Sequence, residues 1–283
     1  MVANIPNSDS ERGLLSYIWP MNIAVNTRWL LPGKLEGTGV YTLNILREVV
    51  HAFPQHQFHL LFDRPSAARA QWLEAPNVVH HTVLPPARHP KLWWIWNELS
   101  VPMYLKRFNI DLYWSPDGFA ALTSRRQWIT VHDLNFEHHP EWVQAPVARY
   151  YKKHIRRSVQ RAERIFTVSQ WSAEDLQRTY GVEKSRLAVT YNAPQHAFTA
   201  GPRNASEPYF CAVGALTPRK NLATLLRAFD RWLALHPERR NYRLRIAGEA
   251  HFKDRALEQE ISELPFASHI LWMGRLDRQA LQQ

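Results

Sequence analysis

The stretch VGALTPRKNLATLLRAF, residues 213–229, decides the fold because it reads as a strand, a tight turn and a helix in succession. An apolar run ends at Gly214, a polar turn follows, and leucines then recur at helical spacing. Arg219 and Lys220 stand where the helix begins, although the helix dipole disfavours positive charge at that end. An anion such as a diphosphate, bound at the free N–H groups of the helix, would explain these cations. Two solvated surface cations are an equally open interpretation.

Apolar runs typical of buried strands alternate with helical patterns along the rest of the chain. Before the opening stretch, strands are predicted at 22–26, 58–62, 77–83, 110–115, 128–133, 164–169 and 186–192. Helices are predicted from near Gly39 and at 90–107, 145–162 and 170–180. Later strands are predicted at 209–214, 242–248 and 269–274, with helices near 253–263 and from Asp277. This alternation predicts an α/β protein with parallel sheets.

The alternation is interrupted once, which predicts two domains. A Pro-containing segment without periodicity leads us to expect an N-terminal domain over 21–195, a linker over 196–207 and a second domain over 208–283. Residues 1–20 are expected to form a disordered extension. The second domain has three predicted strands, whereas an open sheet usually has about five or six. We therefore expect this domain to be incomplete and the chain to be truncated within it.

Composition narrows the classes of partner. Lysine and arginine number 35 against 25 acidic residues, giving a net charge of +10 and favouring an anionic partner. The chain has no Walker A and no GxGxxG pattern, so it lacks the phosphate-binding motifs of P-loop NTPases and of dinucleotide dehydrogenases. It also has no zinc-finger spacing and no RNP motif, so no nucleic-acid partner is expected. The single cysteine, Cys211, excludes an internal disulfide and fits a reducing cytoplasm.

A basic stripe is predicted on the helix over 145–162. Seven cations recur at steps of three and four: Arg149, Lys152, Lys153, Arg156, Arg157, Arg161 and Arg164. This stripe is either a solvated helix face or a surface for anionic lipid headgroups. Trp93, Trp94 and Trp96, flanked by cations, suit either a membrane interface or a core helix.

The opening stretch resembles the donor-phosphate motif of family 4 glycosyltransferases, Val-Gly-x-x-x-Pro-Arg-Lys-Asn-Leu. Other segments resemble the family in the same order: MNIAVNTRWLLPGKLEGTGVYTLNIL, TVHDLNFEHHPEW, RIFTVSQWSAEDLQRTYGV with RLAVTYNAP, RLRIAGE and HILWMGRLDRQALQQ. The match spans about 21–283. Each segment alone is weak evidence, but together in this order they are specific.

This resemblance implies a GT-B fold, in which two Rossmann-like domains face a cleft. The N-terminal domain would take a glycan or lipid-linked acceptor, and the C-terminal domain a nucleotide-diphosphate sugar. Transfer would retain the anomeric configuration and need no metal and no cofactor. Arg219, Lys220 and Gly214 would bind the donor diphosphate, and the two cations would offset the charge that builds up on the leaving group.

The resemblance also implies site residues in the N-terminal domain. Gly37 and Gly39 would border the donor diphosphate, although a turn that needs positive φ would also explain them. His132 is predicted at the end of a buried strand, where it would line the cleft near the transferred sugar as a catalytic residue. A lone histidine is also often structural. Asp133 would orient His132 or cap a turn.

One family signature is absent: no glutamate here has another glutamate eight positions later. We therefore expect this polypeptide to be weakly active or inactive. The function expected from the family is transfer of a hexose such as mannose during surface polysaccharide or lipopolysaccharide synthesis. The expected location is cytoplasmic, with peripheral attachment at the inner membrane face. The alternative is a non-catalytic remnant that binds a membrane surface or a partner subunit.

Overall fold

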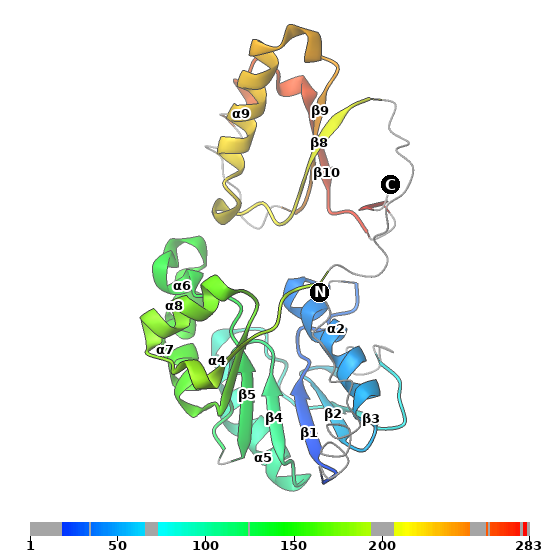
Figure 1. Cartoon of the computed structure of the whole chain (residues 1–283), viewed down its shortest axis with the longest axis vertical. Coiled ribbons are helices and arrows are strands. Elements are labelled where there is room, and N and C mark those ends of the chain that lie inside the picture. The colour runs from blue at the N-terminus through cyan, green and yellow to red at the C-terminus, as the bar shows by residue number, and fades with distance from the viewer. Residues whose placement is uncertain are drawn as a thin grey trace, which may run out of the picture. The chain divides into compact units, whose positions relative to one another are not determined.

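The computed structural model of the chain describes residues 19–33, 35–65, 73–123, 125–193, 207–249, 259, 261–277 and 280–281. The chain forms two compact units, unit 1 over Met1–Ala193 and unit 2 over Pro194–Gln283 (Figure 1). Most of the predicted extension over 1–20 and of the predicted linker over 196–207 lies outside the described residues, as does most of the predicted helix near 253–263.

Unit 1 is built on a seven-stranded sheet in the order β3-β2-β1-β4-β5-β6-β7. The strands are β1 (Asn22–Asn26), β2 (Gln57–Phe62), β3 (Val78–Thr82), β4 (Leu112–Ser115), β5 (Arg126–Thr130), β6 (Arg164–Thr167) and β7 (Leu187–Val189). Every neighbouring pair is parallel. This arrangement confirms the α/β prediction for unit 1.

The helices of unit 1 follow its strands. They are α2 (Gly37–Ala52), α4 (Pro90–Ile95), α5 (Val101–Arg107), α6 (Asn135–His138), α7 (Ala145–Arg161) and α8 (Gln170–Tyr180). The helix predicted over 90–107 contains a π-helical turn at Trp96–Ser100, between α4 and α5. Ser169 caps α8 by accepting a hydrogen bond from the Ser172 N–H, and Gly181 ends the helix in a left-handed conformation.

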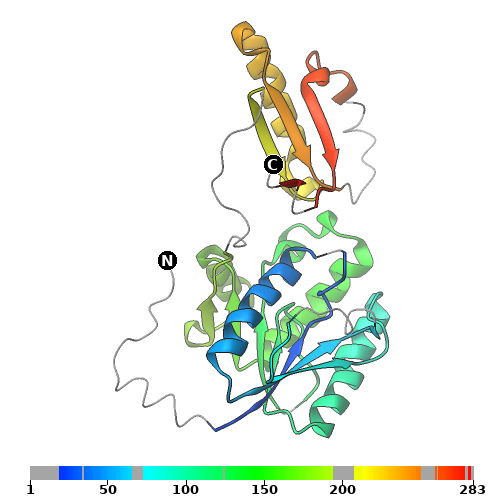
Figure 2. The ribbon, with the colours of Figure 1, turned by 90° about the vertical axis from the view of Figure 1, so that its right-hand side faces the viewer.

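Two apolar layers hold these helices to the sheet. On one face, Leu46 and Val50 of α2 pack with Val25 and Phe58. On the other face, side chains of α4, α5 and α7 pack with Tyr113 and other strand residues. The two groups of helices lie on opposite sides of the strands (Figure 2). Neighbouring residues of a strand point to opposite faces of the sheet, so a strand that is apolar at nearly every position contributes side chains to both layers.

The tryptophans of this region divide between core and surface. Trp93 and Trp96 are buried, and their indole N–H groups donate to the carbonyl oxygens of Ala87 and Val83. The Trp94 side chain is 44% exposed. The core interpretation is therefore correct for Trp93 and Trp96, and only Trp94 of the three is available at the surface.

Unit 2 contains a three-stranded parallel sheet in the order β10-β9-β8. Its elements are β8 (Tyr209–Val213), the 3-10 turn η4 (Pro218–Lys220), α9 (Leu222–Leu235), β9 (Arg243–Ala247) and β10 (Ile270–Gly274). One face of the sheet packs on α9 through residues such as Leu226, Phe229 and Ile246.

The predicted burial of β8 is wrong, because β8 lies at an edge of the described sheet and its alternate side chains point away from α9. Val213 is 61% exposed, and Cys211 is exposed as well. Within the described ranges, no helix of either unit combines the length and the apolar composition needed to cross a bilayer.

Candidate active site

The strand order of unit 1 reverses at β1, which pairs with β2 on one side and β4 on the other. In open parallel sheets, ligands bind outside the carboxyl ends of the strands at such a switch point. Both strands end in a polar residue at this position. The Asn26 side-chain amide donates to Ser115 Oγ across 3.1 Å and links the two strand ends.

An ion pair lies just beyond this link. Arg28 Nε donates to Asp117 Oδ2 at 2.6 Å, and both side chains are buried. The indole N–H of Trp29 donates to the same oxygen at 3.0 Å. The guanidinium lies 5.2–5.5 Å from the ring centres of Trp29, Trp93 and Phe119. The pair therefore fixes the loop after β1 against the loop after β4.

Sequence reasoning missed Arg28 and Asp117. Arg28 Nη1 and Nη2 are buried and have no hydrogen-bond partner among the described residues. The available signal was a charged residue two positions after the end of each of two buried strands, in the segments NTRW and SPDG. That signal becomes informative once β1 and β4 are known to be neighbours.

His132 lies in the loop after β5, because that strand ends at Thr130 rather than at residue 133 as predicted. Its Nε2–H donates to the carbonyl oxygen of Pro116 at 2.9 Å. A carbonyl oxygen can only accept, so this bond fixes the tautomer and leaves Nδ1 as an acceptor. Burial lowers the pKa of His132, although the hydrogen bond to Pro116 and the charges of Asp133 and Asp117 oppose the shift. The imidazole is therefore neutral at pH 7.

Tyr41 brings the first turns of α2 to His132. Its ring lies edge-on to the imidazole, with centroids 4.9 Å apart. Its hydroxyl hydrogen-bonds with Thr190 Oγ1 at 2.6 Å, after β7. Tyr41 therefore joins the glycine segment of α2 to the loops after β5 and β7.

Gly37 and Gly39 are the first and third residues of α2. Neither has a positive φ, so the interpretation as a left-handed turn is wrong. A Cβ on Gly39 would lie 2.7 Å from the Trp29 carbonyl oxygen, whereas a Cβ on Gly37 would meet nothing within 4 Å. The Glu36 side chain makes no capping hydrogen bond at this helix start. Gly39 is thus required for close backbone packing, and the surroundings of Gly37 leave room for a ligand.

Asp133 caps a turn, one of the two roles considered for it. Its Oδ1 accepts a hydrogen bond from the Asn135 N–H at 3.1 Å, at the start of α6. His132 is oriented instead by the Pro116 carbonyl.

In unit 2, the predicted strand, turn and helix are present in that order. Gly214 follows β8 with φ 148°, and Arg219 and Lys220 are exposed on η4. A Cβ on Gly214 would lie 3.5 Å from Lys220 Cε. Within the part of the chain that the structure describes, neither cation forms a side-chain hydrogen bond or ion pair. Both cations are therefore free to meet an anion.

Glycine also marks the ends of the other two strands of unit 2, which sequence reasoning did not single out. Gly248 follows β9, and β10 ends at Gly274. A Cβ on Gly248 would lie 1.9 Å from the Gly214 carbonyl oxygen, so no side chain fits there. The signal was the repeated pattern of a strand followed by glycine, in AVG, IAG and WMG.

The predicted site residues thus form two groups. His132, Asp133, Gly37 and Gly39 belong to unit 1, and Gly214, Arg219 and Lys220 belong to unit 2. Among the described residues, no three His, Cys, Asp or Glu side chains are grouped to hold a metal ion.

Comparison with known proteins gives two family matches. The family described as Glycosyltransferase Family 4 matches residues 35–194, and the family described as Glycosyl transferases group 1 matches residues 196–283.

Two curated relatives are O-antigen chain mannosyltransferases. One, RfbU of Salmonella typhimurium, is 28% identical over 158 residues, covering 56% of this chain and 44% of the relative. The other, O-antigen chain mannosyltransferase B of Escherichia coli, is 25% identical over 183 residues, covering 60% of this chain and 47% of the relative. The chain spans about half the length of the curated relatives it matches.

Solved structures share the fold at low sequence identity. A glycosyltransferase from Rickettsia africae superposes with a TM-score of 0.60 at 12% identity, covering 93% of this chain and 70% of the other. WaaG, a glycosyltransferase involved in lipopolysaccharide biosynthesis, superposes with a TM-score of 0.61 at 12% identity, covering 91% of this chain and 71% of WaaG. A UDP-N-acetylglucosamine 2-epimerase superposes with a TM-score of 0.54 at 9% identity, covering 91% of this chain and 70% of the epimerase. Because this enzyme is named for a different reaction, the fold alone does not decide the reaction. The GT-B prediction is confirmed, and the chain belongs to glycosyltransferase family 4.

Proposed function

We propose that this protein transfers a hexose, mannose, from a nucleotide-diphosphate sugar to a glycan or lipid-linked acceptor during O-antigen synthesis, with retention at the anomeric carbon. The observation that carries the proposal is the exposed pair Arg219 and Lys220 at the start of α9, beside Gly214. The mannose and O-antigen assignments draw support from the curated relatives.

In the proposed reaction, the bond between the anomeric carbon and the diphosphate oxygen breaks. The acceptor hydroxyl forms the new glycosidic bond, and its proton leaves with the nucleoside diphosphate. Negative charge grows on the diphosphate as it departs, and preorganised cations lower the barrier by offsetting that charge. Arginine binds phosphate oxygens in pairs, whereas lysine supplies a mobile point charge. Arg219 and Lys220 therefore divide these two tasks, and neither requires a metal or a cofactor.

His132 is proposed to position the transferred sugar. Its Nε2–H is occupied by Pro116, so Nδ1 accepts a hydrogen bond from a sugar hydroxyl. The lowered pKa keeps that acceptor unprotonated at pH 7. The first N–H groups of α2 are proposed to bind an anionic group of the donor, which the open space at Gly37 would allow.

Calorimetry of UDP and GDP binding to the 283-residue chain tests this proposal. We expect micromolar binding that Lys220→Ala weakens at least about tenfold, since a hydrogen bond to a charged group contributes about 1.5–3 kcal/mol. Arg231→Ala is the matched control, because Arg231 is an exposed cation of the same helix, far from its first turn. Absence of nucleotide binding by the intact chain would overturn the proposal.

The second candidate is a non-catalytic protein that binds an anionic membrane surface or a partner subunit through α7. Arg149, Lys153 and Arg157 are exposed at steps of four and have no partner within the described ranges. The stripe is narrower than predicted, since Lys152 lies 3.6 Å from a Glu137 oxygen and Arg161 lies 3.0 Å from a Glu98 oxygen. These three cations also support peripheral attachment of an active enzyme at the cytoplasmic membrane face.

A further inference from the structure

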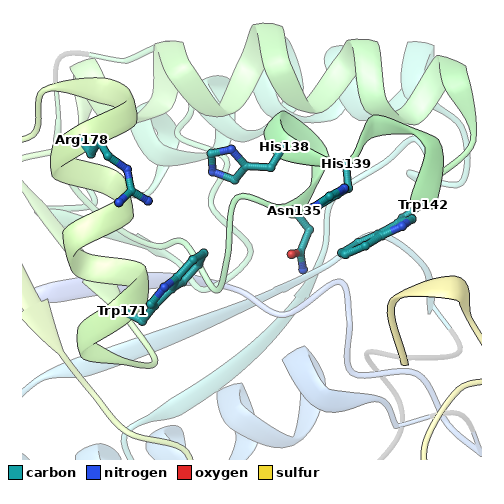
Figure 3. A pocket seen from close by; sticks show the side chains of 6 residues that line it. All are labelled: Asn135, His138, His139, Trp142, Trp171 and Arg178. Carbon is teal, nitrogen blue, oxygen red and sulfur yellow. The ribbon is translucent and has the colours of Figure 1, made fainter. Parts of the chain in front are cut away.

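A pocket of about 340 Å³ opens on unit 1, apart from the residues assigned above to the transfer site. Its lining residues are Asn135, His138, His139, Trp142, Trp171 and Arg178. Figure 3 shows the two indoles on either side of the Asn135 carboxamide, with His138 and Arg178 above them. This volume lies within the range of about 300–1,000 Å³ that is usual for small-molecule sites.

The pocket is built by the segments that follow β5 and β6. The first contributes α6 and the 3-10 turn Pro140–Trp142, and the second contributes α8. Ser172 Oγ, in the first turn of α8, donates to the His132 carbonyl oxygen at 3.1 Å. This bond ties the wall that carries Trp171 to the segment that carries His132. The pocket therefore adjoins the carboxyl edge of the sheet, where the acceptor is proposed to bind.

The aromatic walls of the pocket are not explained by core packing. The Trp171 side chain is 59% exposed. Trp142 stacks on the His139 ring, with centroids 3.9 Å apart and planes 12° from parallel. This stacking gives Trp142 a fixed orientation. Large rigid rings contribute much of the binding energy at recognition sites. A sugar ring has apolar C–H faces that stack on such rings and hydroxyls that need polar partners at its edge.

The polar partners are present, and their charges are locally balanced. Asp175 is fully buried and binds both His138, at 2.9 Å, and Arg178, at 3.0 Å. Burial raises the pKa of Asp175, but the hydrogen bonds from His138, Thr179 and Arg178 outweigh burial and hold that pKa below its ordinary value. His139 lies 3.0 Å from a Glu141 oxygen. The pocket therefore holds oriented donors without excess positive charge, which favours a neutral ligand over an anionic one.

We propose that this pocket binds a neutral hexose residue of the acceptor glycan, other than the sugar transferred at His132. The Trp142 and Trp171 rings supply the stacking faces, and Asn135 and Arg178 supply hydrogen bonds to hydroxyls. This inference rests on the proposed glycosyltransferase function for its choice of ligand.

The test is saturation-transfer NMR, with affinity by titration, of the full chain with the neutral trisaccharides mannotriose and maltotriose. We expect at least one to bind in the millimolar range or tighter. Trp171→Ala should weaken that binding about five- to tenfold, because truncating an interface tryptophan usually costs more than 1 kcal/mol. Asn135→Ala should weaken it in the same direction. Trp94→Ala is the matched control, since it removes a part-exposed indole from α4 and should leave binding unchanged.

Three outcomes would overturn the inference: no binding of either trisaccharide, equal binding by Trp171→Ala, or tighter binding of digalacturonic acid than of the neutral sugars. Circular dichroism of each variant establishes that it is folded. UDP and GDP binding, measured on the same samples, separates this inference from the proposed function. If the chain binds a trisaccharide but no nucleotide, the transferase proposal is wrong and the pocket proposal stands. If it binds a nucleotide but neither trisaccharide, the pocket proposal is wrong and the transferase proposal stands.

Discussion

The Tyr41 ring lies edge-on against the His132 imidazole, with ring centroids 4.9 Å apart and planes at 78°. This contact joins α2, which begins at Gly37, to the loop after β5. Two segments that the sequence analysis singled out separately therefore meet in one place.

Replacing His132 by alanine should lower kcat/KM for transfer about tenfold to a hundredfold, because a sugar hydroxyl loses its acceptor. UDP and GDP affinity should stay the same, since the proposed diphosphate contacts are elsewhere. His51→Ala is the control, because His51 is an exposed histidine in the last turn of α2. A variant with unchanged turnover would show that His132 is structural.

Gly39→Ala should destabilise unit 1 by about 1–3 kcal/mol, because the new Cβ would lie 2.7 Å from the Trp29 carbonyl oxygen. Gly37→Ala should be neutral or stabilising by up to about 1 kcal/mol, because its Cβ enters open space and alanine favours helix. Urea unfolding followed by circular dichroism measures both. Equal effects of the two substitutions would contradict the packing role of Gly39.

Asp117→Asn should destabilise the protein by about 3–5 kcal/mol, since it leaves the buried Arg28 guanidinium without its counter-charge. Glu163→Gln is the matched control. It breaks the exposed ion pair with Arg126, and we expect a loss below about 1 kcal/mol. Denaturant midpoints of the two variants give the comparison, and similar midpoints would argue against a structural role for the buried pair.

Stability should fall as the pH is lowered from about 6.5 towards 4, in part because of His81. Burial, together with the charges of His59 and His80, lowers the pKa of His81 to about 4. Over this range the unfolded chain binds a proton that the folded chain does not, so protonation favours unfolding. The contribution is on the order of 1 kcal/mol, less than the full shift implies, because the ring is partly exposed and screened by solvent.

His81→Gln should flatten this part of the stability curve. The exposed His51→Gln should leave it unchanged. Thermal unfolding at pH 7 and pH 5 measures the slope for each protein, and an unaltered slope in His81→Gln would contradict the assignment.

Replacing Arg149, Lys153 and Arg157 together by glutamine should weaken binding to phosphatidylglycerol vesicles by about a hundredfold, because each cation contributes about 1 kcal/mol near an anionic surface. Raised salt should abolish the difference. Replacing Arg88, Lys184 and Arg231, three exposed cations outside α7, is the control of equal charge. If both triple variants bind vesicles equally, net charge alone explains the binding and the stripe on α7 has no specific role.

The regular elements could be predicted from local pattern. β1 was predicted at its observed bounds, and α8 begins after Ser169 and ends at Gly181 as expected. The position of Arg219 and Lys220 between a strand and a helix was also predicted correctly. These features depend on residues within one turn or one strand of each other, so the sequence itself carries the signal.

Other features depend on which strands become neighbours. The Arg28–Asp117 pair and the contact of Tyr41 with His132 join residues that are far apart in the chain. The pocket with Trp142 and Trp171 likewise needs the loops after β5 and β6 to lie side by side.

The sequence by itself determined the order of strands and helices, the family and the position of two cations just before α9, because periodicity, turn residues and capping are local properties. Only the tertiary structure decided that Gly39 serves backbone packing and that β8 lies at an edge of the described sheet. These outcomes follow from packing and burial between distant segments, which one-dimensional spacing does not encode.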